Sequence, residues 1–281
     1  MPTIQVVALL RSAHPGPVLV LTTLVLALGL AVGLTPGRLA LVVAAVLAGQ
    51  LSIGLSNDAI DADRDRASGR TDKPIAQGQA SKRVAWIVAV TLLVLALLIS
   101  VPLGAGFVAA NATTIFAAWA YNLGLKQTAF SLVPFLSFGL FPSLATLAAP
   151  GGGLAPFWAG TAAAALGMAG HFTNALPDLD ADERTAVRGL PHRLGARTSA
   201  ILAALFVLGG ALAGLLGTSG AHLTEVPALG WVFFGLVAGC AVAALVLALV
   251  RPATRAPFQL VMLGSLLLAV QLVATAGSLT G

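Results

Sequence analysis

The acidic residues of this sequence are concentrated in two short segments. Nine of the ten Asp and Glu residues fall in 57–72 and 174–183. Each segment contains an asparagine followed by two aspartates at intervals of four residues. The six residues are Asn57, Asp61 and Asp65 in the first segment, and Asn174, Asp178 and Asp182 in the second. Because a four-residue interval returns to the same face of a helix, each segment predicts a stripe of one amide and two carboxylates.

These stripes favour binding of a divalent cation. Four carboxylates that face one another repel strongly unless a cation lies between them, and oxygen ligands without His or Cys favour Mg²⁺ over zinc or copper. Mg²⁺ commonly joins one or two carboxylates to substrate phosphates, so the stripes predict two clamps on a diphosphate. Asp63 and Asp180 lie roughly 200° away around the helix and are weaker ligand candidates. The alternative, that the acidic segments are solvated helix ends, is less favoured because the stripe is repeated.

Basic residues follow each stripe. Arg70 and Lys73 follow the first, and Arg188 and Arg193 follow the second. Arg offers a planar pair of donors to phosphate oxygens and Lys offers a point charge, so these residues are candidate diphosphate ligands. The alternative for each residue by itself is the ordinary basic charge beside a membrane helix.

The two segments align at an offset of 117 residues, which indicates a duplication. Besides the six stripe residues, the offset matches Pro74 with Pro191 and Gly78 with Gly195. We therefore expect two repeat halves, roughly 1–125 and 126–281, within one domain that covers 1–281. Parallel repeats bring equivalent segments together around a central site.

Composition places the chain in a lipid bilayer. It is 58% hydrophobic and 9% charged, which is too apolar for a water-soluble domain. A membrane-spanning helix needs roughly 20 apolar residues. The sequence therefore predicts an all-α bundle of about nine transmembrane helices, near 17–34, 38–56, 84–103, 105–122, 130–149, 154–173, 199–217, 228–250 and 257–279.

Charge asymmetry predicts the orientation of these spans. Alternating spans place every Lys and Arg except Arg38 on one side, which the positive-inside rule makes cytoplasmic. We therefore expect the N-terminus and both acidic segments inside, the C-terminus outside, and the protein in the cell inner membrane. The basic side then lies beside anionic lipid and is no argument for nucleic-acid binding.

With these features the sequence resembles the UbiA superfamily of intramembrane prenyltransferases. The first family signature, Asn-Asp-x2-Asp-x3-Asp, corresponds to Asn57–Asp65, and the second, Asp-x3-Asp, to Asp178–Asp182. The basic family pattern after the first signature corresponds to Arg70–Pro74, with Lys73 in place of the usual second arginine. A further family element, a tyrosine shortly before a lysine, corresponds to Tyr121 and Lys126.

The resemblance implies a role for each of these residues. Asp61, Asp65, Asp178 and Asp182 would be the catalytic Mg²⁺ ligands, with Asn57 and Asn174 in support. Arg70, Lys73 and Lys126 would bind the diphosphate. Tyr121 would contact the diphosphate or the acceptor, or else anchor a helix at the membrane interface. Arg11, with His14 close behind, resembles the family's basic entry segment, or else anchors the first span. His171 is expected to be structural.

The implied activity is Mg²⁺-dependent transfer of an isoprenyl group from a prenyl diphosphate to an aromatic or other small lipophilic acceptor. Such an enzyme has a prenyl diphosphate, a lipophilic acceptor and membrane lipid as its partners. A first alternative is a terpene cyclase of the same fold, which ionises the same donor without an acceptor. A second alternative is a transporter or channel, since repeats and intramembrane acids also mark ion pathways. Clustering of the acids at one membrane face argues against this second alternative.

Overall fold

The computed structural model describes residues 2–176, 189–220, 222–250, 256–275 and 279. This part of the chain is helical throughout and contains no strand. Its α-helices are α1 (Pro2–Ser12), α2 (Pro15–Ala31), α3 (Pro36–Ala67), α4 (Lys82–Ser100), α5 (Ala105–Leu123), α6 (Phe141–Leu147), α7 (Phe157–Ala175), α9 (Leu190–Gly217), α10 (Ala228–Val250) and α11 (Ala256–Ala274). Short 3₁₀ helices are η1 (Val101–Leu103), η2 (Leu125–Gln127), η3 (Val133–Leu140) and η4 (Leu223–Glu225).

The helices follow the predicted spans in position. Four of them are long and apolar enough to cross a membrane: α3, α4 with η1, α9 and α10. α1 and α2 together form a fifth candidate, bent by 63° between Ser12 and Pro15. The chain is therefore a multi-pass membrane protein, and the count of nine crossings remains a prediction.

Three elements differ from the regular spans that the sequence predicted, and one of them is α9, which begins at Leu190 rather than near 199. The segment 130–149 is not one α-helix but η3 followed by α6. Pro134 and Pro142 each stand in the first turn of these elements, where the absent N–H of proline interrupts continuous α-helical bonding. α3, by contrast, continues eleven residues past the predicted end of its span at 56. This extension carries the first acidic stripe.

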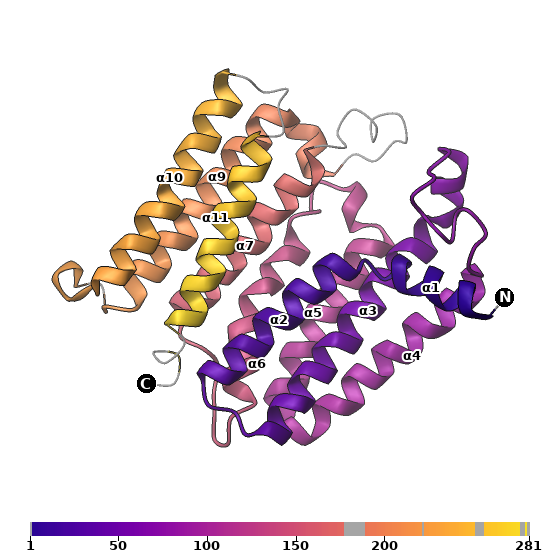
Figure 1. Ribbon diagram of the computed structural model, residues 1–281, viewed down its shortest axis with the longest axis horizontal. Coiled ribbons are helices and arrows are strands. Elements are labelled where there is room, and N and C mark those ends of the chain that lie inside the picture. Colours follow the sequence, from indigo (N-terminus) through magenta and orange to yellow (C-terminus); the bar gives the residue numbers. More distant parts are fainter. Residues whose placement is uncertain (1, 177–188, 221, 251–255, 276–278, 280–281) are drawn as a thin grey trace.

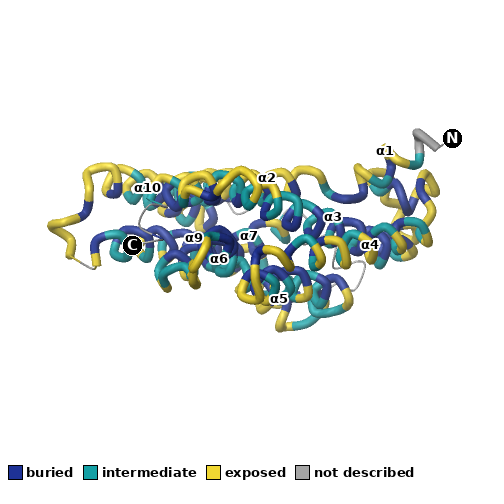
Figure 2. Tube along the Cα trace, turned by 90° about the horizontal axis from the view of Figure 1, so that it is seen from below, coloured by how far each residue is buried: buried dark blue, intermediate teal, exposed yellow. Residues whose placement is uncertain are grey.

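The helices form two groups that lie side by side (Figure 1). α2 to α5 make up one group, α9 to α11 make up the other, and α7 lies between them. Buried residues face neighbouring helices, and exposed residues follow the outer surfaces (Figure 2). Large apolar side chains such as Leu19, Leu98 and Leu266 are exposed there, as expected of a surface that faces lipid.

Small side chains allow α7 and α9 to pack closely. Buried alanines stand along both helices: Ala159, Ala162, Ala163, Ala165 and Ala169 on α7, and Ala200, Ala203, Ala204 and Ala211 on α9. Of these, Ala169 lies in one buried cluster with Ala203, Ala204 and Ala211. Within a bilayer, helix association depends on such close packing because lipid removes most of the hydrophobic driving force. The pair holds the end of α7, and hence Asn174, against the rest of the bundle.

Residues that align between the two expected halves share some local features. The aligned glycines Gly78 and Gly195 both have a left-handed backbone, with φ of 75° and 78°. A side chain is strained in this region, so glycine suits both positions. The aligned Pro74 and Pro191 are both buried. α3 and α7 carry the two aligned asparagines, and the duplication itself stays a prediction.

Candidate functional site

Two adjoining cavities lie where α3, α5, η3 and α7 meet. One, of about 320 Å³, is lined mainly by charged and polar side chains, and we call it the polar cavity. The other, of about 280 Å³, is lined mainly by apolar side chains, and we call it the apolar cavity. Asn57, Tyr121, Phe135 and Asn174 line both. The two cavities therefore form one site with a charged part and an apolar part.

The first acidic stripe lines the polar cavity. Because α3 is continuous to Ala67, Asn57, Asp61 and Asp65 lie on one face of the helix, and all three contribute to the cavity wall. Asp63 lies elsewhere on the helix and is exposed. It pairs with Lys82 at 2.6 Å and with Arg66 at 3.3 Å. The helical spacing thus separates the cavity-lining aspartates from Asp63, as the sequence predicted.

Asp61 is held by two cations. The Lys126 ammonium donates to Asp61 Oδ2 at 2.5 Å, and Arg64 Nη2 lies 3.1 Å from the same oxygen. Lys126 belongs to η2, between the spans, and is only 7% exposed. Burial lowers the pKa of Lys126, and the adjacent Asp61 carboxylate opposes that shift. Lys126 therefore reaches the cavity as predicted, where it is paired with an aspartate.

Asp65 is the exception among these acidic groups. The residue is 5% exposed, and within the described chain no residue donates a hydrogen bond to its carboxylate or pairs with it directly. The carboxylate lines the polar cavity together with that of Asp61, and a bound cation would offset the repulsion between the two negative charges. The donor set of two carboxylates and the Asn57 amide has the oxygen chemistry that Mg²⁺ prefers, so these residues fit that ion.

The described residues contain only part of the predicted metal site. No three His, Cys, Asp or Glu side chains converge among them to hold an ion. Asp178 and Asp182, predicted as the remaining carboxylate ligands, lie outside the described residues, as does Arg188. Asn174, the first residue of the second stripe, lines the polar cavity opposite α3. The two asparagines of the repeat thus meet at one cavity.

The predicted diphosphate ligands of the first segment, Arg70 and Lys73, also line the polar cavity. Arg70 donates twice to Asp72, through Nε to Oδ1 at 2.8 Å and through Nη2 to Oδ2 at 2.7 Å. This bond holds the pKa of the Asp72 carboxyl at about 2. Lys73 donates to the buried Asp58 at 2.6 Å. Both cations are therefore positioned by neighbouring carboxylates.

Two predicted ligands lie away from both cavities. Arg11 is exposed on α1, and Arg193 is exposed on α9, and neither contributes to the walls of the polar or the apolar cavity. His192, beside Arg193, lines the polar cavity instead. His171 also lines it and is hydrogen-bonded to Ser131 at 3.0 Å, and its structural role stays a prediction.

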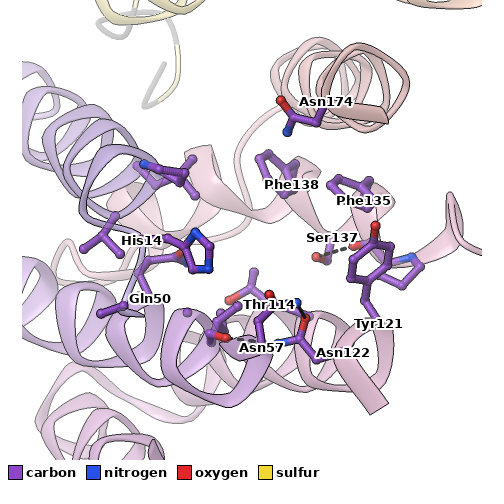
Figure 3. A pocket seen from close by; sticks show the side chains of 18 of the residues that line it. His14, Gln50, Asn57, Thr114, Tyr121, Asn122, Phe135, Ser137, Phe138 and Asn174 are labelled. Carbon is purple, nitrogen blue, oxygen red and sulfur yellow. Dashed lines mark hydrogen bonds between the residues drawn. The ribbon is translucent and has the colours of Figure 1, made fainter. Parts of the chain in front are cut away.

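Aromatic side chains line the junction between the charged part of the site and the apolar part. Tyr121 packs edge-on against Phe135 with ring centroids 5.2 Å apart, and Phe135 stacks on Phe138 at 5.8 Å. Figure 3 shows these rings on one side of the apolar cavity, with Asn57, Thr114 and Asn122 below them and His14 at the far end. This wall is suited to an apolar chain or a delocalised cation.

The sequence did not assign a site role to several of these residues. Arg64 stands three positions after Asp61, and the helical spacing could have identified it. Asp58 lies within the first signature, and Asn122 lies between Tyr121 and Lys126, but no separate role was predicted for either residue. Phe135 and His192 carried no signal in the sequence, since only the packing of η3 and α9 brings them to the cavity.

A family model for the UbiA prenyltransferase family matches residues 18–276. The chain belongs to this family. The match covers both acidic segments, α2 from residue 18 onward and every described helix after it. A comparison of this chain with curated proteins found no significant match.

Solved structures show the same fold at low sequence identity. The chain is similar to a digeranylgeranylglyceryl phosphate synthase, with a TM-score of 0.75, 14% identity, and coverage of 98% of this chain and 99% of that one. It is also similar to a UbiA homologue from Archaeoglobus fulgidus bound to GPP and Mg²⁺, with a TM-score of 0.69, 15% identity, and coverage of 96% and 99%. A third similar structure is that of a UbiA homologue from Aeropyrum pernix K1, with a TM-score of 0.69, 17% identity, and coverage of 90% of this chain and 96% of that one.

Proposed function

We propose that this UbiA-family chain is an Mg²⁺-dependent intramembrane prenyltransferase. It transfers an isoprenyl group from a prenyl diphosphate to an aromatic or other small lipophilic acceptor. The observation that carries this proposal is the Asp65 carboxylate, which has no partner among the described residues and lines a cavity with Asp61 and four cations, Lys126, Arg64, Arg70 and Lys73. Homologues with this fold have been solved with GPP or DMAPP and Mg²⁺.

Mg²⁺ would be held by Asp61 and Asp65 with Asn57, completed by Asn174, Asp178 and Asp182 of the second segment. The bound ion supplies electrostatic stabilisation of the negative charge that develops on a diphosphate leaving group.

The side chains of the polar cavity bind and orient the donor. Arg70 and Lys73 supply donors for diphosphate oxygens that the metal does not neutralise. Lys126 and Arg64 offset the charge of Asp61, so that the cavity attracts an anion in spite of its carboxylates. These groups favour cleavage of the bond between C1 of the prenyl chain and the diphosphate oxygen.

The apolar cavity receives the prenyl chain and the acceptor. Phe135, Phe138 and Phe141 line it and exclude water from the allylic carbon, where water would compete with the acceptor as nucleophile. Tyr121, at the junction of the two cavities, is placed to contact either the diphosphate or the acceptor. The face that carries the polar cavity is cytoplasmic in this proposal, because the basic residues of the connections gather there.

The test is release of inorganic pyrophosphate by purified protein from C10, C15 and C20 prenyl diphosphates, with and without Mg²⁺, and with extracted products analysed by mass spectrometry. Release that requires both Mg²⁺ and an added lipophilic acceptor supports the transferase. Mg²⁺-dependent release without acceptor, yielding a cyclic hydrocarbon or a terpene alcohol, would replace it with the cyclase alternative. A protein that never cleaves the donor is not an enzyme of either kind.

A further inference from the structure

His14 has an unusual backbone at the edge of the apolar cavity. It occupies the break between α1 and α2, and it is the only non-glycine residue in the described chain with positive φ, at φ 55° and ψ 65°. A left-handed backbone is unfavourable for a residue with a Cβ, and such residues persist where the surrounding structure requires their position.

The imidazole is anchored by a buried carboxylate. His14 Nε2 lies 2.8 Å from Asp58 Oδ1, and Lys73 Nζ lies 2.6 Å from the same oxygen and 3.3 Å from Nε2. Asp58 is 2% exposed. Since Asp58 beside Lys73 is a hydrogen-bond acceptor, Nε2 carries the hydrogen of this contact. Nδ1 is then the basic nitrogen of the neutral ring, and it has no hydrogen-bond partner within the described chain.

The ring is accessible from the apolar cavity. The His14 side chain is 39% exposed, and Figure 3 shows it at the end of the cavity opposite Tyr121. The break that presents it is held closely against α3, because a Cβ at Gly54 would collide with the Ala13 carbonyl oxygen. Absence of a side chain at Gly54 is therefore what allows His14 to approach the cavity and Asp58.

The rest of the cavity indicates which molecule would meet Nδ1. Its described polar lining consists of amides and hydroxyls, such as Gln50, Thr114 and Ser137, with no Lys, Arg, Asp or Glu side chain in its wall. This lining suits a neutral hydroxyl group better than a carboxylate or a phosphate. An acceptor bound here would present an uncharged O–H to an imidazole whose other nitrogen is fixed by Asp58.

We propose that His14 is the general base of this enzyme and that its acceptor is a neutral phenol or enol. The proposal rests on the prenyltransferase function proposed above. The bond from prenyl C1 to the diphosphate oxygen breaks, and its electron pair leaves with the diphosphate. The acceptor forms the new bond to C1, and its hydroxyl proton passes to Nδ1. The resulting imidazolium later loses the proton to water, so charge and atoms balance.

Asp58 and Lys73 are positioning residues for this step. Asp58 holds the tautomer with hydrogen on Nε2 and stabilises the imidazolium after proton transfer. Lys73 lines the polar cavity while contacting the same Asp58 oxygen. The carboxylate thus connects the base in one cavity with a cation in the other.

The experiment uses His14→Gly, because glycine tolerates positive φ and the lost ring leaves space for free imidazole. We expect transfer to a phenol to fall about 100-fold or more, while the donor KM and inhibition by pyrophosphate stay unchanged. Added imidazole should raise the transfer rate of His14→Gly by about tenfold or more. A phenol that is already ionised at the assay pH should show a much smaller loss. His222→Gly, at an exposed histidine, controls for imidazole effects.

Other outcomes would overturn the proposal. Wild-type transfer by His14→Gly shows that the ring takes no proton. A parallel loss of donor or pyrophosphate affinity places His14 in diphosphate binding instead. If neither added imidazole nor an ionised phenol restores the transfer rate of His14→Gly, the role of His14 is structural. His14→Asn is a second variant for the same comparison, because asparagine also tolerates positive φ. Failure of the proposed function is distinct, because the wild-type protein would then not transfer at all.

Discussion

Asn57 donates a hydrogen bond through Nδ2 to Asn122 Oδ1 at 3.0 Å. Asn122 is itself fixed, since its Nδ2 donates to the Ile53 carbonyl at 3.0 Å and to Ser56 Oγ at 2.9 Å. The Asn57 amide is therefore held with its nitrogen committed to α5 and its oxygen available to the cavity. A carbonyl oxygen is the amide atom that a hard cation prefers, so Asn122 prepares Asn57 for metal binding.

Asn122→Ala should raise the Mg²⁺ concentration needed for half-maximal activity by about 10-fold or more, because loss of a residue that orients a metal ligand weakens metal binding to this degree. The measurement is a Mg²⁺ titration of pyrophosphate release. Asn111→Ala is the matched control, since Asn111 is an equally buried asparagine of α5 whose amide donates to Ser100 away from the cavity. Equal Mg²⁺ requirements in the two variants would contradict the role of Asn122.

Asp65→Asn and Asp61→Asn should each lower turnover by about 100-fold or more without unfolding the protein, because each amide keeps the shape of the side chain but loses the charge that binds the cation. The same loss is expected for Asp178→Asn from the sequence. Turnover and thermal stability in detergent would be measured together.

Asp63→Asn provides the control for these substitutions, since Asp63 lies on the same helix but is exposed and paired with Lys82. Near-wild-type turnover of folded Asp65→Asn would refute the metal site. A loss in Asp63→Asn as large as that in Asp65→Asn would show that the assignment by helix face is wrong.

Lys126→Met should destabilise the protein, because the buried Asp61 carboxylate would lose its closest cation and keep only Arg64. The double variant Lys126→Met with Asp61→Asn should lose less stability than the sum of the losses in the two single variants. We expect the interaction energy from this double-mutant cycle to be roughly 1–3 kcal/mol. A cycle on the exposed Lys82 and Asp63 pair is the comparison, and it should show no measurable coupling. Additive effects at Lys126 and Asp61 would contradict the buried pair.

Gly54→Ala should displace the break between α1 and α2, because the new methyl group would meet the Ala13 carbonyl oxygen. We expect a loss of about 1–3 kcal/mol in stability, as for other overpacked sites, and reduced transfer with an unchanged donor KM. Gly16→Ala, where a methyl group has open space, should be neutral or slightly stabilising. Tolerance of alanine at both glycines would mean that this break does not depend on close contact.

The local features of the site could be predicted from the sequence because they depend on helix periodicity. The four-residue spacing of Asn57, Asp61 and Asp65 needs only a continuous helix to place these groups on one face, and α3 provides it. Likewise, the hydropathy pattern located the helices, since apolar runs of sufficient length have few alternatives in a bilayer.

The contacts between distant residues could not be predicted in the same way. Lys126 and Asp61 are 65 positions apart, and His14 and Asp58 are 44 apart. These pairs form only when η2 and the α1–α2 break pack against α3, and no local pattern encodes that packing. The break of 130–149 at η3 was also missed, although Pro134 and Pro142 carried the signal. Hydropathy alone treated both prolines as part of a span.

The wall common to the two cavities also has a consequence for inhibition. Asn57, Tyr121, Phe135 and Asn174 face both spaces, so no continuous barrier separates the charged part from the apolar part. A single compound that joins a bisphosphonate to a phenol by a short linker would occupy both at once. Its second half would bind at a high effective concentration once the first is in place, giving an affinity above that of either fragment.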